Sequence, residues 1–336
     1  MSSAPTAEQI ARDATWLAQA LDPASGKVRL VAMDRDSYRA ASFLDDRLTQ
    51  QPVDAQVLPW PDVEGAIAPD LRSDARWIFH IGHVGSTLIS RLLGEFDGVL
   101  AIREPRLLRD LALMPQPVRG QYIRCITRLM SRTFAEEECA CVKATSFVSE
   151  IAPLLVPPGE RALFIYAQPR TYIASILAGE NSLKDLRAHE EYRSQRLEGR
   201  GITFSSLRND AERAAAGWAC EMTAIETAAE AMSDKAVRWE DFDAMLSDMR
   251  SSLGRVAEFF QFPGDGARLD EIVEGPLMKR YSKALEYEYS PGLRYEVIAD
   301  AERRHGRDID AALAMLDAAS ESSRLLARAV ARAREG

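Results

Sequence analysis

Hydrophobic and polar residues alternate along the chain in two different ways. From about residue 75 onward, short apolar runs typical of buried strands are separated by segments whose apolar residues recur at helical spacing. The runs predict strands at 77–81, 99–104, 139–143, 162–167 and 236–240, and the periodic segments predict helices at 106–114, 119–133, 146–155, 212–232 and 253–260, with another starting over 171–177. Strands that are apolar throughout are buried on both faces. We therefore predict an α/β domain over residues 71–336, with a mostly parallel central sheet flanked by helices on both faces.

Residues 1–70 predict a helical N-terminal prefix that packs on this domain. Helical spacing covers 7–21 and 37–48, an apolar run at 28–32 predicts a strand, and four prolines between 52 and 69 predict an irregular segment. A role as a lid over a site is the alternative interpretation. At the other end, 298–335 predicts a helical C-terminus.

Residues 180–210 form a highly polar insertion in the predicted domain. Such a segment is either a solvated insertion or a mobile gate for substrate, because long loops at strand ends often carry function. Both interpretations stay open at this point.

Charge and cysteine content narrow the class of protein. The net charge of −9 argues against nucleic acid or an anionic membrane as the main partner, so an anionic ligand would need a local basic pocket. None of the four cysteines forms a CxxC pair or a zinc-site spacing, which favours a reducing, cytoplasmic location over a disulfide framework. We see no signal-peptide pattern, and no stretch approaches the ~18 apolar residues of a membrane helix.

One stretch, 77–93, carries the clearest candidate chemistry. A strand-like run leads through Gly82-His83-Val84-Gly85-Ser86-Thr87 into an apolar-periodic helix. Glycines allow backbone to approach an anion closely, and the N–H groups and dipole of a helix start favour phosphate or sulfate. Ordinary turn and cap chemistry is the competing interpretation. The loop does not fit the nucleotide-kinase pattern, because only two residues separate its glycines and no lysine precedes Ser86.

The order of these segments resembles that of the sulfotransferase family, including its bacterial members. The loop at 82–88 is similar to the segment that holds a 5′-phosphosulfate, and Arg103-Glu104-Pro105 and Val142-Lys143-Ala144-Thr145 are similar to the ends of the family's second and third strands. Residues 165–170 with Ser175 resemble the 3′-phosphate motif, and 238–242 resembles a later Glu-Asp segment. The resemblance covers about 75–178 and, weakly, 212–262. It implies a P-loop-type α/β fold and the donor 3′-phosphoadenosine-5′-phosphosulfate (PAPS).

The resemblance also implies roles for individual residues. It places the donor on the loop, the 3′-phosphate motif and a basic C-terminal cluster, namely Gly82, His83, Val84, Gly85, Ser86, Thr87, Arg170, Ser175, Lys279 and Lys283. Glu104 is the first candidate base, with His83 second, and His83 or Lys143 would stabilise the leaving oxygen. Structural alternatives accompany each of these roles, such as an ion pair of Glu104 with a neighbouring arginine. The scheme needs no metal.

Two departures from the family pattern concern the donor. His83 stands where lysine or arginine is usual, and Ala167 stands where the strand motif has an arginine, for which Arg170 is a substitute. The leading hypothesis is a PAPS-dependent sulfotransferase acting on a hydroxyl or amine of a small molecule. A kinase-like phosphotransferase using another nucleotide is the alternative, and a non-catalytic nucleotide-binding protein on a decayed scaffold is the third. The acceptor and the oligomeric state are not predicted.

Overall fold

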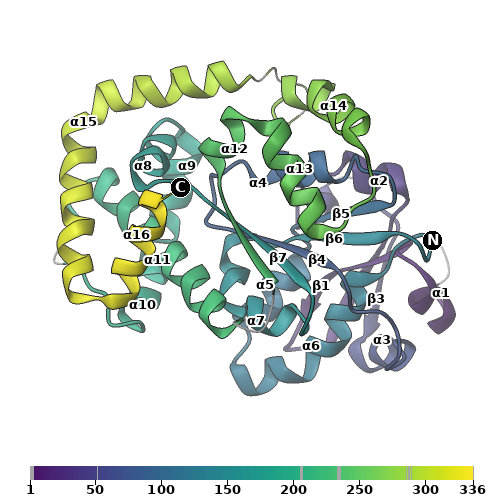
Figure 1. Ribbon diagram of the computed structural model, residues 1–336. Coiled ribbons are helices and arrows are strands. Elements are labelled where there is room, and N and C mark those ends of the chain that lie inside the picture. The colour runs from purple at the N-terminus through teal and green to yellow at the C-terminus, as the bar shows by residue number, and fades with distance from the viewer. Residues whose placement is uncertain are drawn as a thin grey trace.

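A computed structural model describes residues 4–50, 52–204, 207–232, 236–284, 286, 288 and 290–335 (Figure 1). Its centre is a five-stranded sheet of β4 (Arg76–His80), β5 (Val99–Arg103), β6 (Cys139–Lys143), β7 (Arg161–Tyr166) and β8 (Ala236–Asp241). The strand order is β5-β6-β4-β7-β8, and every neighbouring pair is parallel. All five predicted strands are confirmed to within a residue or so at each end, as is the α/β architecture.

Helices cover both faces of this sheet, as the apolar strands require. On one face α4 (Ser86–Leu93) packs with α13 (Met249–Phe260), and on the other lie α6 (Gln116–Ser131), α7 (Ala152–Leu155) and α11 (Asp210–Ala231). The chain leaves β4 toward β5 and later returns across β4 to reach β7. The carboxyl end of β4 is therefore a switch point of the topology, which is where ligands bind on open parallel sheets.

The N-terminal prefix combines a three-stranded sheet with short helices, so the prediction of a helical prefix holds only in part, and the predicted strand at 28–32 is confirmed. The expected helix over 7–21 stops early, because α1 spans Ala7–Arg12 and β1 spans Trp16–Asp22. β1 pairs antiparallel with β2 (Lys27–Ala32), which pairs with β3 (Ala55–Pro59). The first six residues of β1 are buried, including the polar Gln19. Burial on both sides of the strand hides the two-residue period that would have distinguished it from a helix.

Two other expectations for the prefix are also corrected. The predicted helix at 37–48 is the shorter α2 (Arg35–Ala40), which Asp34 caps, followed by a loop and a 3₁₀ turn, η1 (Leu48–Gln50). The proline-containing stretch is not irregular, because β3 ends at Pro59 and α3 (Trp60–Ala66) has Pro61 in its first turn. Proline is tolerated at a strand end and in a first helical turn, where no N–H is required.

The described part of the polar insertion folds into two helices that dock on the domain. These are α9 (Glu180–Ala188) and α10 (Glu190–Glu198), whose Leu186 and Leu197 are buried near α11. The side chain of Arg196 also lies 3.1 Å from that of Glu221 on α11. The insertion is thus a packed helical pair over 180–198, followed by turns and irregular chain up to α11, and Ser205 and Ser206 lie outside the described residues.

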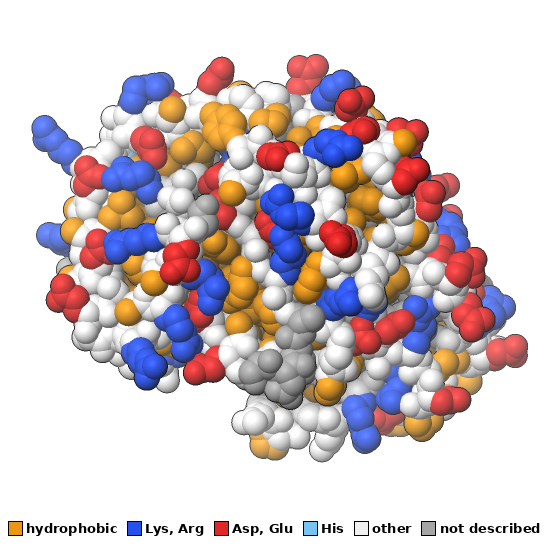
Figure 2. Space-filling view, viewed as in Figure 1, with side chains coloured by type: hydrophobic (Ala, Val, Ile, Leu, Met, Phe, Trp, Pro, Cys, Tyr) orange, Lys and Arg blue, Asp and Glu red, His pale blue; other side chains and the backbone are white. Residues whose placement is uncertain are grey.

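The remaining elements surround the carboxyl edge and one end of the sheet. They are α5 (Arg106–Leu113), η2 (Ser146–Ile151), α8 (Pro169–Leu177), α12 (Phe242–Ser247), α14 (Gly266–Glu274), η3 (Pro276–Lys279), α15 (Pro291–Ser322) and α16 (Arg324–Glu335). The yellow α15 and α16 in Figure 1 confirm the helical C-terminus and pack on α8 and α11. Within the described residues, no helix is both long and apolar enough to cross a membrane. Basic and acidic side chains are interspersed over the face shown in Figure 2.

Candidate functional site

The loop after β4 adopts a backbone that leaves the start of α4 without a side-chain cap. Gly82, His83 and Gly85 all have positive φ angles, of 82°, 54° and 59°. Gly85 is the N-cap residue of α4 and offers no side chain to the first N–H groups, so these and the helix dipole are available to an anion. A Cβ atom built on Gly85 would lie 1.9 Å from the ring of Phe242. Only glycine fits here, and Phe242 holds the loop in place.

The predicted loop hydroxyls lie where the sequence placed them. Ser86 and Thr87 are the first two residues of α4, with 5% and 2% of their surface exposed, and Val84 is fully buried. Val84 therefore anchors the loop through its side chain, and any part it has in binding an anion is through its backbone.

A cavity of about 260 Å³ opens against this loop. Four of the predicted residues line it, namely His83, Gly85, Ser175 and Lys283. Arg280, which belongs to the basic cluster at 279–283, and Arg294, which the sequence analysis did not single out, line it as well. Its described lining contains no carboxylate, but Arg294 is ion-paired at 3.0 Å with Asp243, which is not a lining residue. This is the local basic pocket that an anionic ligand requires in a chain of net charge −9.

His83 does not supply positive charge in this structure. Burial, reinforced by the nearby Lys283 ammonium, lowers the pKa of His83 to about 4, so its ring is neutral at pH 7. Its Nδ1 lies 3.4 Å from the hydroxyl of Ser182. The cations of the cavity come from the C-terminal part of the chain, and the signal for Lys283 was the basic cluster at 279–283. Arg294 gave no such signal, because it lies in a helix with many charged residues.

Six of the ten predicted donor ligands are not among the lining residues. Four of them lie in the adjacent loop and helix start, namely Gly82, Val84, Ser86 and Thr87, and the other two lie on other elements. Arg170 is the second residue of α8, is 45% exposed in its side chain and forms an ion pair with Asp310 of α15 at 2.5 Å. Lys279 is exposed at the end of η3 and is not among the lining residues. Their proposed nucleotide contacts stay predictions, and for Arg170 they require the ion pair with Asp310 to open.

Next to the loop, the ends of three adjacent strands bring together a buried charged cluster. Lys143 ends β6 with only 1% of its surface exposed, and its ammonium forms an ion pair with Oε1 of Glu104, directly after β5. Burial lowers the pKa of Lys143, while the carboxylate of Glu104 opposes that shift. His80, the last residue of β4, places Nε2 3.8 Å from the same Oε1. The expected ion pair of Glu104 with a neighbouring arginine is thus replaced by one with Lys143.

The backbone of Glu104 is held in a conformation that side chains rarely adopt. Its φ angle is +52°, although it precedes Pro105, and proline favours an extended conformation in the residue before it. The N–H of Glu104 donates to the backbone oxygen of Lys143 at 2.7 Å. Strained residues of this kind cost about 1–3 kcal/mol and cluster at functional sites. This strain supports a functional role for Glu104.

The N-terminal prefix supplies a wall beside this cluster. The backbone N–H of Leu44 donates to the backbone oxygen of Arg103 at 2.8 Å, which ties the loop after α2 to the end of β5. The adjacent Phe43 ring lies 5.7 Å from the Lys143 ammonium and 3.4 Å from the Arg47 guanidinium. The sequence analysis missed Phe43 and Arg47, because an isolated aromatic or basic residue in a loop gives no pattern.

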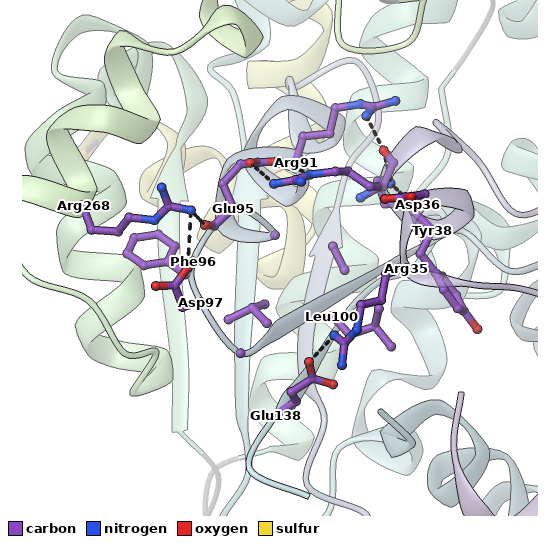
Figure 3. Close-up of a pocket in the computed structure, with 16 residues that line it drawn as sticks. Arg35, Asp36, Tyr38, Arg91, Glu95, Phe96, Asp97, Leu100, Glu138 and Arg268 are labelled. Carbon is purple, nitrogen blue, oxygen red and sulfur yellow. Dashed lines mark hydrogen bonds and ion pairs between the residues drawn. The ribbon is translucent and has the colours of Figure 1, made fainter. Parts of the chain in front are cut away.

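Another cavity, of about 270 Å³, lies between α2, α4, the start of β5 and α14 (Figure 3). Arginines line it too, but they face carboxylates: Arg35 pairs with Glu138, and Arg39 pairs with Glu95. Because its charges compensate one another, this cavity is a weaker candidate for an anionic ligand than the one at the start of α4. The described residues contain no group of three or more His, Cys, Asp or Glu side chains placed to hold a metal ion.

Comparisons with known proteins give a limited result. No family model matches the chain, and no curated protein matches it. Among solved structures, it is similar to a sulfotransferase domain from the curacin biosynthetic pathway, with a TM-score of 0.42, 12% identity, and coverage of 70% of this chain and 91% of that one. It is also similar to a sulfotransferase domain from the Synechococcus PCC 7002 olefin synthase, with a TM-score of 0.39, 14% identity, and coverage of 66% and 86%. The α/β assignment itself rests on the observed sheet.

Proposed function

We propose that the protein is a sulfotransferase that moves a sulfuryl group from PAPS to a hydroxyl or amine of a small-molecule acceptor. The observation that carries the proposal is the cavity at the start of α4. Its described lining holds no carboxylate and three cations, one of them paired with Asp243, in a protein of net charge −9. The buried pair of Glu104 and Lys143 at the neighbouring strand ends adds a candidate base and a candidate cation for the leaving oxygen.

The residues of the cavity fit an anionic ligand. The N–H groups at the start of α4, with the hydroxyls of Ser86 and Thr87, would hold the phosphosulfate end of the donor. Lys283 and Arg294 would compensate its charge. At about 260 Å³ the cavity is slightly smaller than the roughly 300–1,000 Å³ of pockets for drug-sized ligands, so it is sized for the anionic group rather than for a whole nucleotide.

The transfer itself needs positioning and charge stabilisation more than covalent chemistry. The sulfur–oxygen bond to the 5′-phosphate breaks, a bond from sulfur to the acceptor oxygen or nitrogen forms, and the acceptor gives up one proton. In our proposal Glu104 takes that proton, and Lys143 stabilises the negative charge on the bridging oxygen as it leaves. Both roles require the two side chains to part from each other during the reaction. We also propose the cytoplasm as the compartment, in keeping with the four free thiols.

Thermal unfolding with adenosine 3′,5′-bisphosphate, ADP and ATP, each with and without magnesium, tests the proposal. A ligand at about 100 times its Kd should stabilise the protein by roughly 2.7 kcal/mol. We expect a shift with the bisphosphate that does not depend on magnesium, followed by turnover of PAPS with a panel of small-molecule acceptors. A shift with ATP and magnesium alone would instead support the phosphotransferase.

Binding of the bisphosphate without turnover of PAPS on any acceptor would support the non-catalytic nucleotide-binding alternative. Two observations favour that alternative over the phosphotransferase as second candidate, because the ring of His83 is neutral and Arg170 is engaged with Asp310. The absence of a shift with every nucleotide would instead indicate a changed or lost donor site and would contradict all three hypotheses.

A further inference from the structure

His80 is a buried histidine whose proton can be located from its contacts. The side chain ends β4, with 6% of the residue exposed, and its Nδ1 accepts a hydrogen bond from the N–H of Gly82 at 2.9 Å. An Nδ1 that accepts carries no proton. Burial and the nearby ammonium groups of Lys143 and Lys283 hold the pKa of His80 well below 6.5, so the ring is neutral. Its one N–H is therefore at Nε2.

That N–H points toward an oxygen that another donor already occupies. Nε2 of His80 is buried and forms no hydrogen bond of normal geometry among the described residues. The backbone of Ala144 is the nearby acceptor, and its contact with the ring raises the pKa of His80 without offsetting the effect of burial. It lies 3.8 Å from Oε1 of Glu104, beyond hydrogen-bond length, and the ammonium of Lys143 is bound to that same Oε1. A buried donor without a partner is costly, which indicates a state of the site in which this N–H is used.

We propose that His80 is a positioning residue that takes over Oε1 of Glu104 when Lys143 turns to a bound anion. In that state the Nε2–H of His80 donates to the carboxylate, and Gly82, bonded to the opposite side of the ring, keeps the ring aligned. Only hydrogen bonds are exchanged, so no proton is gained or lost. The exchange links occupancy of the loop to release of Glu104 from its ion pair, and the nature of the anion rests on the proposed function.

The location of the proton is tested on the protein without ligand. In ¹⁵N-histidine NMR spectra, with the signal of His80 assigned from its absence in His80→Asn, we expect the neutral tautomer with the proton on Nε2 and no titration between pH 5.5 and pH 8. The titratable groups around the ring are Lys143, Lys283, His83 and Glu104. A proton on Nδ1, or a titration within this range, would overturn the proposal.

The exchange of partners is tested by removing the competing donor. Lys143→Met frees Oε1, so the Nε2 proton of His80 should shift downfield and exchange more slowly with water. The double variant Lys143→Met/Glu104→Ala, which leaves neither charge unpaired, should lose that change. An unchanged signal in Lys143→Met would mean that His80 does not reach Glu104. That result would overturn the proposed exchange of hydrogen-bond partners.

The same signal in the unmodified protein separates this inference from the proposed function. Adenosine 3′,5′-bisphosphate should produce the downfield shift seen in Lys143→Met. Binding without the shift would overturn the exchange, even if Lys143→Met does not fold. If the bisphosphate fails to bind, the proposed function fails, while the Lys143→Met spectra still decide whether His80 can hold Glu104.

A rescue experiment distinguishes positioning from simple packing. His80→Asn keeps an oxygen at the distance of Nδ1 for the N–H of Gly82 but carries no donor at the distance of Nε2. We expect it to keep bisphosphate affinity within about twofold and to lose at least about tenfold in kcat, the size of a 1.4 kcal/mol effect. Full turnover in His80→Asn would leave His80 with a purely structural role.

Discussion

The carboxyl edge of the sheet holds two charged regions that differ in burial and pairing. At the start of α4, Lys283 and the cavity arginines face an open space without a carboxylate in its described lining. At the ends of β5 and β6, Glu104 and Lys143 are buried and bound to each other. Arg280 and Lys283 are exposed, and exposed cations contribute little to folding and are available to a ligand, whereas Arg294 is paired with Asp243. A buried pair such as Glu104 and Lys143 is costly to break. The first region is therefore suited to binding, and the second to a preset chemical step.

The largest effect should come from breaking the buried pair. Glu104→Ala leaves the Lys143 ammonium buried without its carboxylate, so we expect a loss of roughly 3 kcal/mol in the free energy of unfolding, measured in urea. That figure is at the low end for a buried pair because the pKa of Lys143 is already lowered, and the amine can lose its proton. Lys143→Met/Glu104→Ala should recover much of the loss. Equal losses in the single and double variants would mean that the pair is not the source.

The second effect tests the packing that holds the binding loop. Gly85→Ala places a Cβ in the space of the Phe242 ring and requires alanine at a φ angle of 59°. Gly26→Ala is a matched control, because Gly26 has a φ of 62° but nothing within 4 Å of the added atom. The control should lose about 1–2 kcal/mol from backbone strain alone, and Gly85→Ala about 1–3 kcal/mol more from overpacking. Similar losses at both positions would show that Phe242 yields without cost.

A third comparison separates the two basic positions of the C-terminal cluster. Lys283 lines the cavity, whereas Lys279 does not, although only three residues separate them. Lys283→Ala should weaken binding of adenosine 3′,5′-bisphosphate about tenfold, as expected for one charge-assisted contact of about 1.4 kcal/mol. Lys279→Ala should change the Kd by less than about twofold. Calorimetric titration measures both, and an equal loss in the two variants would point to a diffuse field instead of a contact.

The smallest effect is a pH dependence of stability at the cavity. The pKa of His83 is about 4 in the folded protein and about 6.5 when unfolded, so the unfolded chain takes up a proton first as the pH falls. The free energy of unfolding should therefore decrease on acidification, by about 0.8 kcal/mol from this residue between pH 7.5 and pH 6. His83→Asn, which tolerates a positive φ, should remove that part of the slope. An unchanged slope would mean that water reaches the ring.

The central sheet could be predicted because the local sequence pattern identifies each of its strands. A short apolar run bounded by polar residues, such as 139–143, indicates a buried strand without reference to the rest of the fold. Helices between such runs indicate that the strands pair in parallel. The prefix could not be predicted in the same way. Residues 16–21 are buried on both sides and show no two-residue period, so their sequence also fits a helix, and only the pairing with 27–32 decides that they form a strand.

The candidate site likewise has parts that could be predicted from the sequence and parts that could not. The loop at 82–87 and the positions of Glu104 and Lys143 at strand ends could be located from sequence, because they follow the apolar runs directly. The contact between Glu104 and Lys143, the part of His80, and the place of Arg294 at the cavity could not. Glu104 and Lys143 are 39 residues apart along the chain, His80 and Glu104 are 24 apart, and Arg294 is roughly 200 residues from the loop at 82–87. No local sequence pattern spans such separations.

The sequence by itself determined the α/β class, the order of its strands along the chain and the position of the glycine loop that we propose binds an anion, since burial and glycine conformation are local properties. Tertiary structure alone decided the strand order in the sheet and the exclusion of Arg170 and Lys279 from the cavity. It also decided that His83 is neutral while Lys283 faces the cavity. Charge and pairing depend on what surrounds a group in space, and that surrounding is assembled from distant parts of the chain.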